Sequence, residues 1–259
     1  MAQIHPTAII DRKASIGTDC EIGPYCIVEK TAVVGDGCRL GAHAVIRSGV
    51  ELGARVRVDS GAVIGGEPQD LSFDPRVPSR VWIGADCTLR EGVTVNRSLR
   101  EDCVTRLGER VYMMAFSHAA HDCVLGEGAV LANAALLAGH VQVGAFAFVG
   151  GGAGIHQFCR IGEGAMVGGN AAVTKDIPPG LSVVDRNQVV GLNLVGLKRR
   201  GISTEEISAF KRVYRELYQE PGNIRQKARR RLDGNHEIPD LIRRFLEFFQ
   251  EGTRGFVTP

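Results

Sequence analysis

An aliphatic residue recurs every six positions through most of this chain, and this period constrains the fold more than any other feature. One run extends from Ile4 to Ile64, a short one from Ile83 to Val95, and a third from Leu107 to Val173. In most hexads a small side chain follows four residues after the aliphatic one. A six-residue period fits neither an α-helix nor a hairpin sheet. It is typical of a parallel β-helix, in which each hexad forms one short strand and one corner.

Hexapeptide repeats of this form resemble the left-handed parallel β-helix, a triangular prism with three hexads per coil.

Six of the seven cysteines fall in the small slot of a hexad, so we predict that they are buried hydrophobic residues, not metal ligands or disulfide partners. These are Cys20, Cys26, Cys38, Cys87, Cys123 and Cys159, whereas Cys103 lies outside the pattern.

The repeat is interrupted twice and ends well before the C-terminus. Residues 65–82 and 96–106 are out of step with the hexads, and loops on a rigid scaffold commonly carry function. A proline-rich segment at 175–180 predicts the end of the repeat. We therefore predict a β-helix domain at 1–190 and a C-terminal α-helical domain at 191–259. Its helices are expected at 203–219, at 223–232 and from 238 onward, the first opened by a Ser203–Glu206 capping box.

Composition excludes a membrane span, because no apolar stretch reaches 18 residues. The first residues lack the basic and apolar regions of a signal peptide, so we expect a cytoplasmic protein. The net charge of +2 neither favours nor excludes a polyanionic partner, and we expect no nucleic acid.

Polar residues recur at the coil spacing in one part of the chain. With three hexads per coil, residues 18 apart should stack about 4.8 Å apart along the axis. This spacing places His121, Gly139 and Gln157 in one outward column, and Asp122 and His140 in the next. The sequence therefore predicts that polar groups from three successive coils converge on one strip.

This strip has the groups that acid–base chemistry needs. A histidine can accept a proton from a hydroxyl near neutral pH, and an adjacent carboxylate can fix its tautomer. A glycine one coil above exposes an N–H suited to an oxyanion. A solvent-facing polar ladder is the alternative, and zinc bound by His121, His140 and His156 is another. Because these three histidines lie in different columns, we expect no metal, and no cofactor.

Several motifs together resemble the acyl-ACP–UDP-N-acetylglucosamine O-acyltransferase family of lipid A synthesis, whose members are hexapeptide-repeat proteins. The resemblance covers nearly the whole chain. It rests on the segments at 118–123, 131–133, 137–141, 156–159, 166–169 and 196–201, on Gln69-Asp70-Leu71, and on Thr253-Arg254-Gly255.

The resemblance implies a cytoplasmic homotrimer that transfers a 3-hydroxyacyl chain from acyl carrier protein to the sugar 3-hydroxyl of UDP-N-acetylglucosamine, the first step of lipid A biosynthesis. It implies that His121 is the general base, that Asp122 orients it, and that the Gly139 N–H meets the oxyanion. Residues implied to line the sugar and acyl site are Gln69, Asp70, His118, His140, His156 and Gln157. Asn193, Arg199 and Arg200 are implied to meet the nucleotide, and Gly169 to set acyl length.

Three positions depart from the family pattern. Ser72 stands where the family usually has Lys, Asn96-Arg97-Ser98 where it has His-Arg-Gly, and Val195 where it has Glu. The departures leave two alternatives open. The chain could be a paralogue that acts on another nucleotide sugar, such as a 3-amino analogue with an amide product, or it could be a non-catalytic sugar-binding trimer. We also expect a basic segment at 225–231 to dock the acidic carrier protein.

Overall fold

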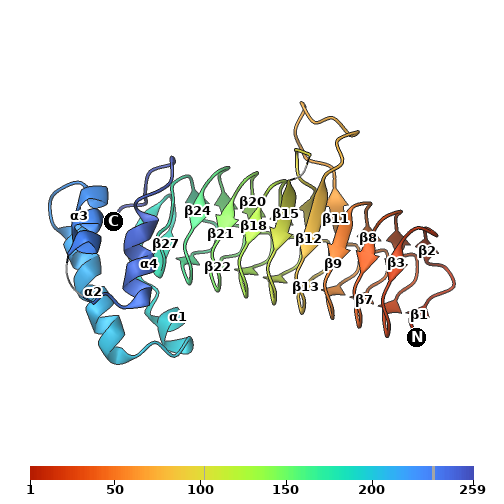
Figure 1. Cartoon of the computed structure of the whole chain (residues 1–259), viewed down its shortest axis with the longest axis horizontal. Coiled ribbons are helices and arrows are strands. Elements are labelled where there is room, and N and C mark those ends of the chain that lie inside the picture. The colour runs from red at the N-terminus through yellow and green to blue at the C-terminus, as the bar shows by residue number, and fades with distance from the viewer. Residues whose placement is uncertain (102, 235–236) are drawn as a thin grey trace.

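The computed structural model describes residues 1–101, 103–234 and 237–259, and forms an elongated three-sided prism with helices at one end (Figure 1). Each coil contributes one short strand to each of three sheets, which we name A, B and C. All described strand pairs of the prism are parallel except the last pair of sheet A, β27–β28. The β-helix of hexapeptide repeats predicted from the six-residue period is therefore confirmed.

The three sheets run along the prism. Sheet A contains, in spatial order, β1 (Gln3–Ile4), β4 (Glu21–Ile22), β7 (Arg39–Leu40), β10 (Arg57–Val58), β13 (Thr88–Leu89), β16 (Tyr112–Met113), β19 (Val130–Leu131), β22 (Phe148–Val149), β25 (Met166–Val167), β27 (Leu181–Val184) and β28 (Gln188–Leu192). Sheet B contains β2 (Ile9–Ile10), β5 (Ile27–Val28), β8 (Val45–Ile46), β11 (Val63–Gly66), β14 (Thr94–Asn96), β17 (His118–Ala119), β20 (Leu136–Leu137), β23 (Gly154–Ile155) and β26 (Ala172–Val173). Sheet C contains β3 (Ser15–Ile16), β6 (Val33–Val34), β9 (Val50–Leu52), β12 (Arg80–Ile83), β15 (Val104–Leu107), β18 (Val124–Leu125), β21 (Gln142–Val143) and β24 (Arg160–Ile161).

The coil spacing is 18 residues wherever the repeat is unbroken. In sheet B, for example, His118 pairs with Leu136, and Leu136 pairs with Gly154. The spacing lengthens only where an excursion leaves the coil. Arg57 therefore pairs with Thr88, and Thr94 pairs with His118.

The interior of the prism is a column of aliphatic and small side chains. The aliphatic residue of each hexad points inward, and from Ile22 to Val173 these residues are at most 3% exposed. Burying such a side chain stabilises the fold by about 1.5–3 kcal/mol. The six cysteines predicted to lie in the small slots are buried and free, and Cys103 is exposed. The thiol of Cys123 donates to the Ala138 carbonyl at 3.2 Å, which satisfies it inside the core.

Two excursions project from the same part of the prism, and the longer one forms the large loop at the top of Figure 1. The loops are shorter than the out-of-step segments of the sequence, because their ends join the sheets. Gly66 pairs with Asn96, and Arg80 pairs with Val104, so the chain leaves the coil only over 67–79 and 97–103. Residue 102, within the second expected loop, lies outside the described residues.

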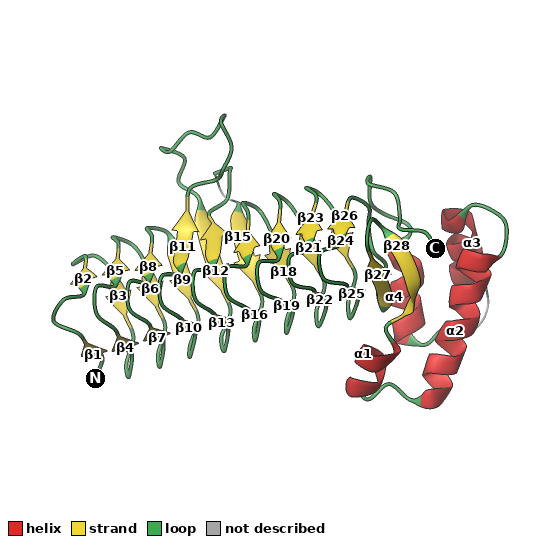
Figure 2. Ribbon diagram, turned by 180° about the vertical axis from the view of Figure 1, so that it is seen from behind, coloured by secondary structure: helices red, strands yellow, loops and turns green. Residues whose placement is uncertain are grey.

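Within the described residues, the C-terminal region closes the last coil with a hairpin and four helices (Figure 2). After the antiparallel pair β27–β28 come α1 (Leu194–Arg199), α2 (Thr204–Gln219), α3 (Ile224–Asp233) and α4 (Asp240–Phe248). The sequence did not predict α1. The Ser203 side chain caps α2 by accepting from the Glu206 N–H at 3.1 Å, as the capping box indicates. None of the described helices is long and apolar enough to cross a membrane.

The helices pack through aromatic side chains, and the tail then returns to the prism. Phe210, Phe245 and Phe249 are fully buried and meet edge to face. Beyond α4, Phe256 forms a bridge with Asp176. The buried Asp176 carboxylate in turn accepts from Arg160 at 2.8 Å. These contacts fix the tail against the last coils.

Candidate active site

The predicted catalytic residues lie on the edge between sheets B and C, which we call the B–C edge. It is made of the turns 120–123, 138–141 and 156–159, which follow β17, β20 and β23. The His140 N–H donates to the His121 carbonyl at 3.0 Å, and the Phe158 N–H donates to the Gly139 carbonyl at 3.1 Å. The turns are therefore stacked at the 18-residue spacing on which the predicted columns depend.

His121 and Asp122 form a hydrogen-bonded pair. The distance from His121 Nδ1 to Asp122 Oδ2 is 2.8 Å, and the two side chains are only 12% and 10% exposed. Asp122 has a φ of 61°, in the left-handed region. Its backbone N–H is satisfied by the Thr105 hydroxyl oxygen at 2.8 Å. With Nδ1 engaged by the carboxylate, Nε2 is the nitrogen available to exchange a proton with a ligand.

The Asp122 carboxylate is held from a second side. Ser98 Oγ donates to Oδ1 at 2.5 Å, and the Leu99 N–H donates to Oδ2 at 3.1 Å. Burial raises the pKa of Asp122, but the hydrogen bonds from Ser98, His121 and Leu99 outweigh it, so the pKa lies below its ordinary value. The carboxylate is therefore ionised at neutral pH.

Gly139 lies directly against the imidazole of His121. A Cβ built on Gly139 would come within 2.5 Å of His121 Cε1 and 2.6 Å of Nε2. Only glycine leaves room for the ring in this position. Among the residues that the structure describes, no group accepts a hydrogen bond from the Gly139 N–H. The site thus pairs a base with a nearby backbone donor that has no partner.

These groups face a cleft of about 810 Å³. Sheet B forms its floor, the B–C edge forms one wall, and the loop 67–79 overhangs it. The predicted residues that line it are Gln69, Asp70, His118, His121, Gly139, His156 and Gln157. Asp122 and His140 lie behind this lining, in contact with His121.

His118 and His140 are both held close to His121. His118 Nδ1 is 2.7 Å from Thr94 Oγ1 on the neighbouring strand, and burial lowers the pKa of His118. His140 meets the His121 ring edge to face at 5.1 Å and stacks on Phe158 at 4.7 Å. Burial lowers the pKa of His140 as well, although Asp122 opposes this. Lowered pKa values favour neutral imidazoles, which can both donate and accept hydrogen bonds.

Asp70 reaches the cleft from the overhanging loop. Its Oδ1 accepts two hydrogen bonds from Ser72, one from the hydroxyl at 2.6 Å and one from the N–H at 2.8 Å. These bonds lower the pKa of Asp70, and the positive potential of His121 contributes in the same direction. Asp70 therefore enters the cleft as an anion.

Comparisons with known proteins identify the family of this chain. Residues 176–257 match the family model described as Udp N-acetylglucosamine O-acyltransferase, Domain 2, and residues 31–66 match the bacterial transferase hexapeptide model. The acyl-acyl-carrier-protein–UDP-N-acetylglucosamine O-acyltransferase of Janthinobacterium sp. (strain Marseille) is 46% identical over 99% of this chain and 100% of its own length. The Herminiimonas arsenicoxydans enzyme of the same name is 43% identical over the same shares.

A solved structure described as UDP-N-acetylglucosamine acyltransferase from Campylobacter jejuni superimposes with a TM-score of 0.93. It is 37% identical and covers 99% of this chain and 100% of its own. This chain belongs to the acyl-ACP–UDP-N-acetylglucosamine O-acyltransferase family. The family predicted from the sequence motifs is confirmed, and the chain is an acyltransferase.

Other residues matched to the family pattern lie away from this cleft. Asn193 caps α1 by accepting from the Gly196 N–H at 2.9 Å, and its amide donates to the Gly164 carbonyl at 3.0 Å. Gly164 belongs to the turn 162–165 on the edge between sheets C and A. Arg200 pairs with Glu163 of the same turn, and Arg199 is exposed.

Gly169 lies on the third edge, in the turn 168–171 between sheets A and B. It is exposed and does not line the cleft of its own chain. A single chain therefore brings the base, the carboxylate and the N–H donor together, but not the residues matched to nucleotide binding and acyl length.

One group of described residues could reach a single metal ion, and it differs from the set weighed from the sequence. Ligand atoms of His121, Asp122 and His140 lie within 4.8 Å of one another, whereas His156 is not in this group. The stacking of adjacent turns brings His121 and His140 together although they belong to different columns. The nearest ligand atoms are, however, already hydrogen-bonded: His121 Nδ1 lies 2.8 Å from Asp122 Oδ2, and Oδ2 also accepts from the Leu99 N–H.

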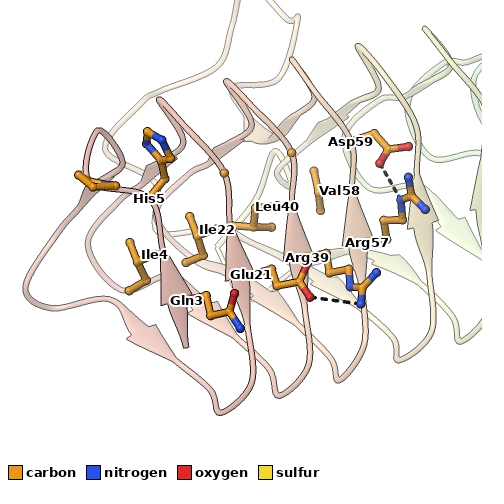
Figure 3. Close-up of a pocket in the computed structure, with 13 residues that line it drawn as sticks. Gln3, Ile4, His5, Glu21, Ile22, Arg39, Leu40, Arg57, Val58 and Asp59 are labelled. Atoms are coloured by element: carbon orange, nitrogen blue, oxygen red, sulfur yellow. Dashed lines mark hydrogen bonds and ion pairs between the residues drawn. The ribbon is translucent and has the colours of Figure 1, made fainter. Parts of the chain in front are cut away.

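A second hollow, of about 630 Å³, lies on sheet A at the N-terminal end (Figure 3). Its charged side chains are paired: Glu21 with Arg39 at 3.2 Å, and Arg57 with Asp59 at 2.8 Å. His5 is the one imidazole of its lining, and its Nδ1 is 2.9 Å from Thr7 Oγ1. This hollow lacks the base, carboxylate and N–H donor arrangement of the B–C edge.

Reasoning from the sequence missed several contacts of the site. Thr94, Ser98 and Thr105 lie within or beside the second excursion, where the 18-residue spacing fails. Arg254 was noted only as part of a terminal motif. In the structure its Nη2 lies 2.6 Å from His156 Nδ1, across 98 residues of sequence. No local signal in the sequence indicates that contact.

Proposed function

We propose that this chain transfers a 3-hydroxyacyl group from acyl carrier protein to the 3-hydroxyl of the sugar in UDP-N-acetylglucosamine, the first step of lipid A biosynthesis. The observation that carries the proposal is the His121–Asp122 pair beside the unpartnered N–H of Gly139, at the wall of the cleft. Membership of the family supplies the donor and acceptor named for its relatives.

The geometry suits a general-base mechanism. His121 Nε2 takes the proton of the sugar hydroxyl as the hydroxyl oxygen attacks the thioester carbonyl. A C–O bond forms, and the carbonyl oxygen, now negative, accepts a hydrogen bond from the Gly139 N–H. When the intermediate collapses, the C–S bond breaks and the imidazolium returns the proton to the thiolate of the carrier. Asp122 stays ionised and stabilises the imidazolium through Nδ1.

The remaining cleft residues position the substrates. We assign Gln69, Asp70, His118, His156 and Gln157, which line the cleft, to the sugar and the acyl chain near the reacting carbonyl. We assign His140 to the same site through its contact with His121, because it lies behind the lining. Asn193, Arg199 and Arg200 contact the nucleotide, and Gly169 sets acyl length, permitting a longer chain because it has no side chain. Because these last residues lie on other edges of the prism, they reach the cleft only from a neighbouring chain. We therefore infer a homotrimer with clefts between adjacent β-helices, acting in the cytoplasm.

The carrier protein requires a basic docking surface. Of the basic residues at 225–231, two have structural roles. Lys227 Nζ donates to the Leu217 carbonyl at 2.6 Å and so caps the end of α2, and Arg225 donates to the Gly252 carbonyl at 2.6 Å. Arg229, Arg230 and Arg231 are exposed on α3. We assign carrier docking to these three arginines.

The test is a direct assay with 3-hydroxyacyl-ACP donors and a panel of nucleotide sugars that includes a 3-amino analogue of UDP-N-acetylglucosamine. We expect UDP-N-acetylglucosamine to be acylated and His121→Ala to lower turnover by roughly 10²–10⁴-fold, the usual contribution of a general base, with the fold intact. Preference for the 3-amino sugar would identify an amide-forming paralogue. Sugar binding without product from any donor would identify a non-catalytic trimer.

A further inference from the structure

The second excursion carries a buried hydroxyl whose contact serves the catalytic pair. Ser98 is fully buried, and its Oγ lies 2.5 Å from Asp122 Oδ1. The other oxygen of the same carboxylate, Oδ2, is the atom that contacts His121 Nδ1 at 2.8 Å. A continuous chain of hydrogen bonds therefore runs from Ser98 through Asp122 to His121.

The direction of each bond follows from the groups involved. An ionised carboxylate is only an acceptor, so the Ser98 hydroxyl donates to Oδ1 and the His121 Nδ1–H donates to Oδ2. The Ser98 hydroxyl also accepts from the Arg100 N–H at 3.2 Å. Its proton has two acceptors in reach, the Arg100 carbonyl at 3.2 Å and Asp122 Oδ1 at 2.5 Å, and the nearer, charged oxygen is the stronger acceptor. With both oxygens engaged, the carboxylate is fixed against rotation about its Cβ–Cγ bond.

We propose that Ser98 is a positioning residue for the acyl transfer, holding the Asp122 carboxylate in the orientation that keeps Oδ2 on His121. The proposal rests on the function assigned above. It gives the second excursion a role: the segment 97–101 reaches the B–C edge and holds the Asp122 carboxylate through Ser98 and Leu99.

The charged groups around the carboxylate agree with this role. His121 and His140 face Asp122 from the B–C edge, with His140 Nε2 3.9 Å from Oδ2, and Arg100 of the excursion lies near His140. On the cleft side, Asp70 faces His121. Without the donor at Oδ1, the carboxylate could turn toward His140 and leave His121 with a weaker partner.

The test replaces Ser98 and measures kcat/KM across pH. Ser98→Ala should lower kcat about 10-fold, with little change in the KM of either substrate. This factor corresponds to losing one hydrogen bond to a charged group in the transition state. The Leu99 N–H still donates to Oδ2, so the loss should be smaller than in His121→Ala. The acidic limb of the kcat/KM profile should move to lower pH, because a carboxylate held less firmly against Nδ1 stabilises the protonated form of the base less. Ser98→Thr, which keeps the hydroxyl, should recover most of the activity.

Ser79→Ala is the matched control. Ser79 is 4% exposed, lies at the base of the first excursion, and its hydroxyl has no hydrogen-bond partner among the described residues. It should retain wild-type kcat and pH profile, and circular dichroism should show all variants folded. A Ser98→Ala enzyme with wild-type kcat and pH profile would overturn the proposal.

A spectroscopic measurement separates this proposal from the proposed function. In protein labelled with ¹⁵N-histidine, the proton shared by His121 Nδ1 and Asp122 should give a downfield resonance, identified by its absence from His121→Ala. Ser98→Ala should broaden or shift that resonance upfield, and Ser98→Thr should restore it. An unchanged resonance would refute the role of Ser98 even if no substrate were ever acylated. A wild-type protein that acylates nothing, with the resonance shifted in Ser98→Ala, would instead refute the proposed function alone.

Discussion

Replacing Gly139 with alanine tests the site at its tightest point. The new Cβ would lie 2.5 Å from His121 Cε1, whereas ordinary contacts begin near 3.4 Å, so the ring must move by about 0.9 Å. Gly139 does not have a positive φ, so alanine fits the backbone there and the N–H donor is kept. A displacement of about 1 Å in a catalytic group can cost roughly 10²-fold in rate. We therefore expect kcat to fall by about that factor although the oxyanion donor remains.

A double-mutant cycle shows whether the loss acts through His121. We would measure kcat for Gly139→Ala, His121→Ala and the double variant with the same acyl-ACP and UDP-N-acetylglucosamine. If Gly139→Ala acts by displacing the imidazole, the double variant should differ from His121→Ala by less than about threefold in kcat. The effects of two substitutions that act through one contact do not add. If the fold-losses in kcat of the two single variants multiply in the double variant, Gly139→Ala damages the site in another way. Wild-type kcat in Gly139→Ala would refute the clash.

Two further predictions concern docking and pH. Replacing Arg229, Arg230 and Arg231 with Glu should raise KM for acyl-ACP, chiefly at low salt because exposed charges are screened over about 8 Å at physiological ionic strength, and leave KM for the nucleotide sugar unchanged. As a control, the double variant Arg12→Glu, Lys13→Glu at the other end of the prism should leave KM for acyl-ACP unchanged. If KM for acyl-ACP also stays constant in the α3 variant, the docking site lies elsewhere. Burial lowers the pKa of His118 from 6.5, so the unfolded chain binds this proton more readily and the free energy of unfolding should fall as pH drops below 6.5. His118→Gln should flatten that slope in chemical denaturation, and an equal slope would contradict the assignment.

The repeat made much of the architecture predictable from the sequence. A hexad period allows few folds, and the 18-residue coil then places His121, Gly139 and Gln157 on one edge without any structure. The same reasoning identified the buried cysteines, because a small inward slot recurs at a fixed position in each hexad. Local stereochemistry predicted the capped start of α2.

The coil spacing failed where the chain leaves the coil. The second excursion adds six residues, so Thr94 pairs with His118 across 24 positions, and Ser98 meets Asp122 across the same 24. Without the length of the excursion, neither contact could be placed. The contact of Arg254 with His156 depends on how the helical tail packs back on the prism, which aromatic burial decides and no period encodes.

Two of the residues that depart from the family pattern, Ser72 and Ser98, make the same kind of contact in the structure. Ser72 and Ser98 each donate a hydroxyl to a carboxylate of the site, Ser72 to Asp70 at 2.6 Å and Ser98 to Asp122 at 2.5 Å. Both hydrogen bonds lower the pKa of the acid that accepts them. Because both carboxylates are then anions at neutral pH, neither holds a proton that it could deliver to the leaving thiolate. In the proposed reaction the mobile proton is therefore assigned to His121, whose Nδ1 contacts Asp122.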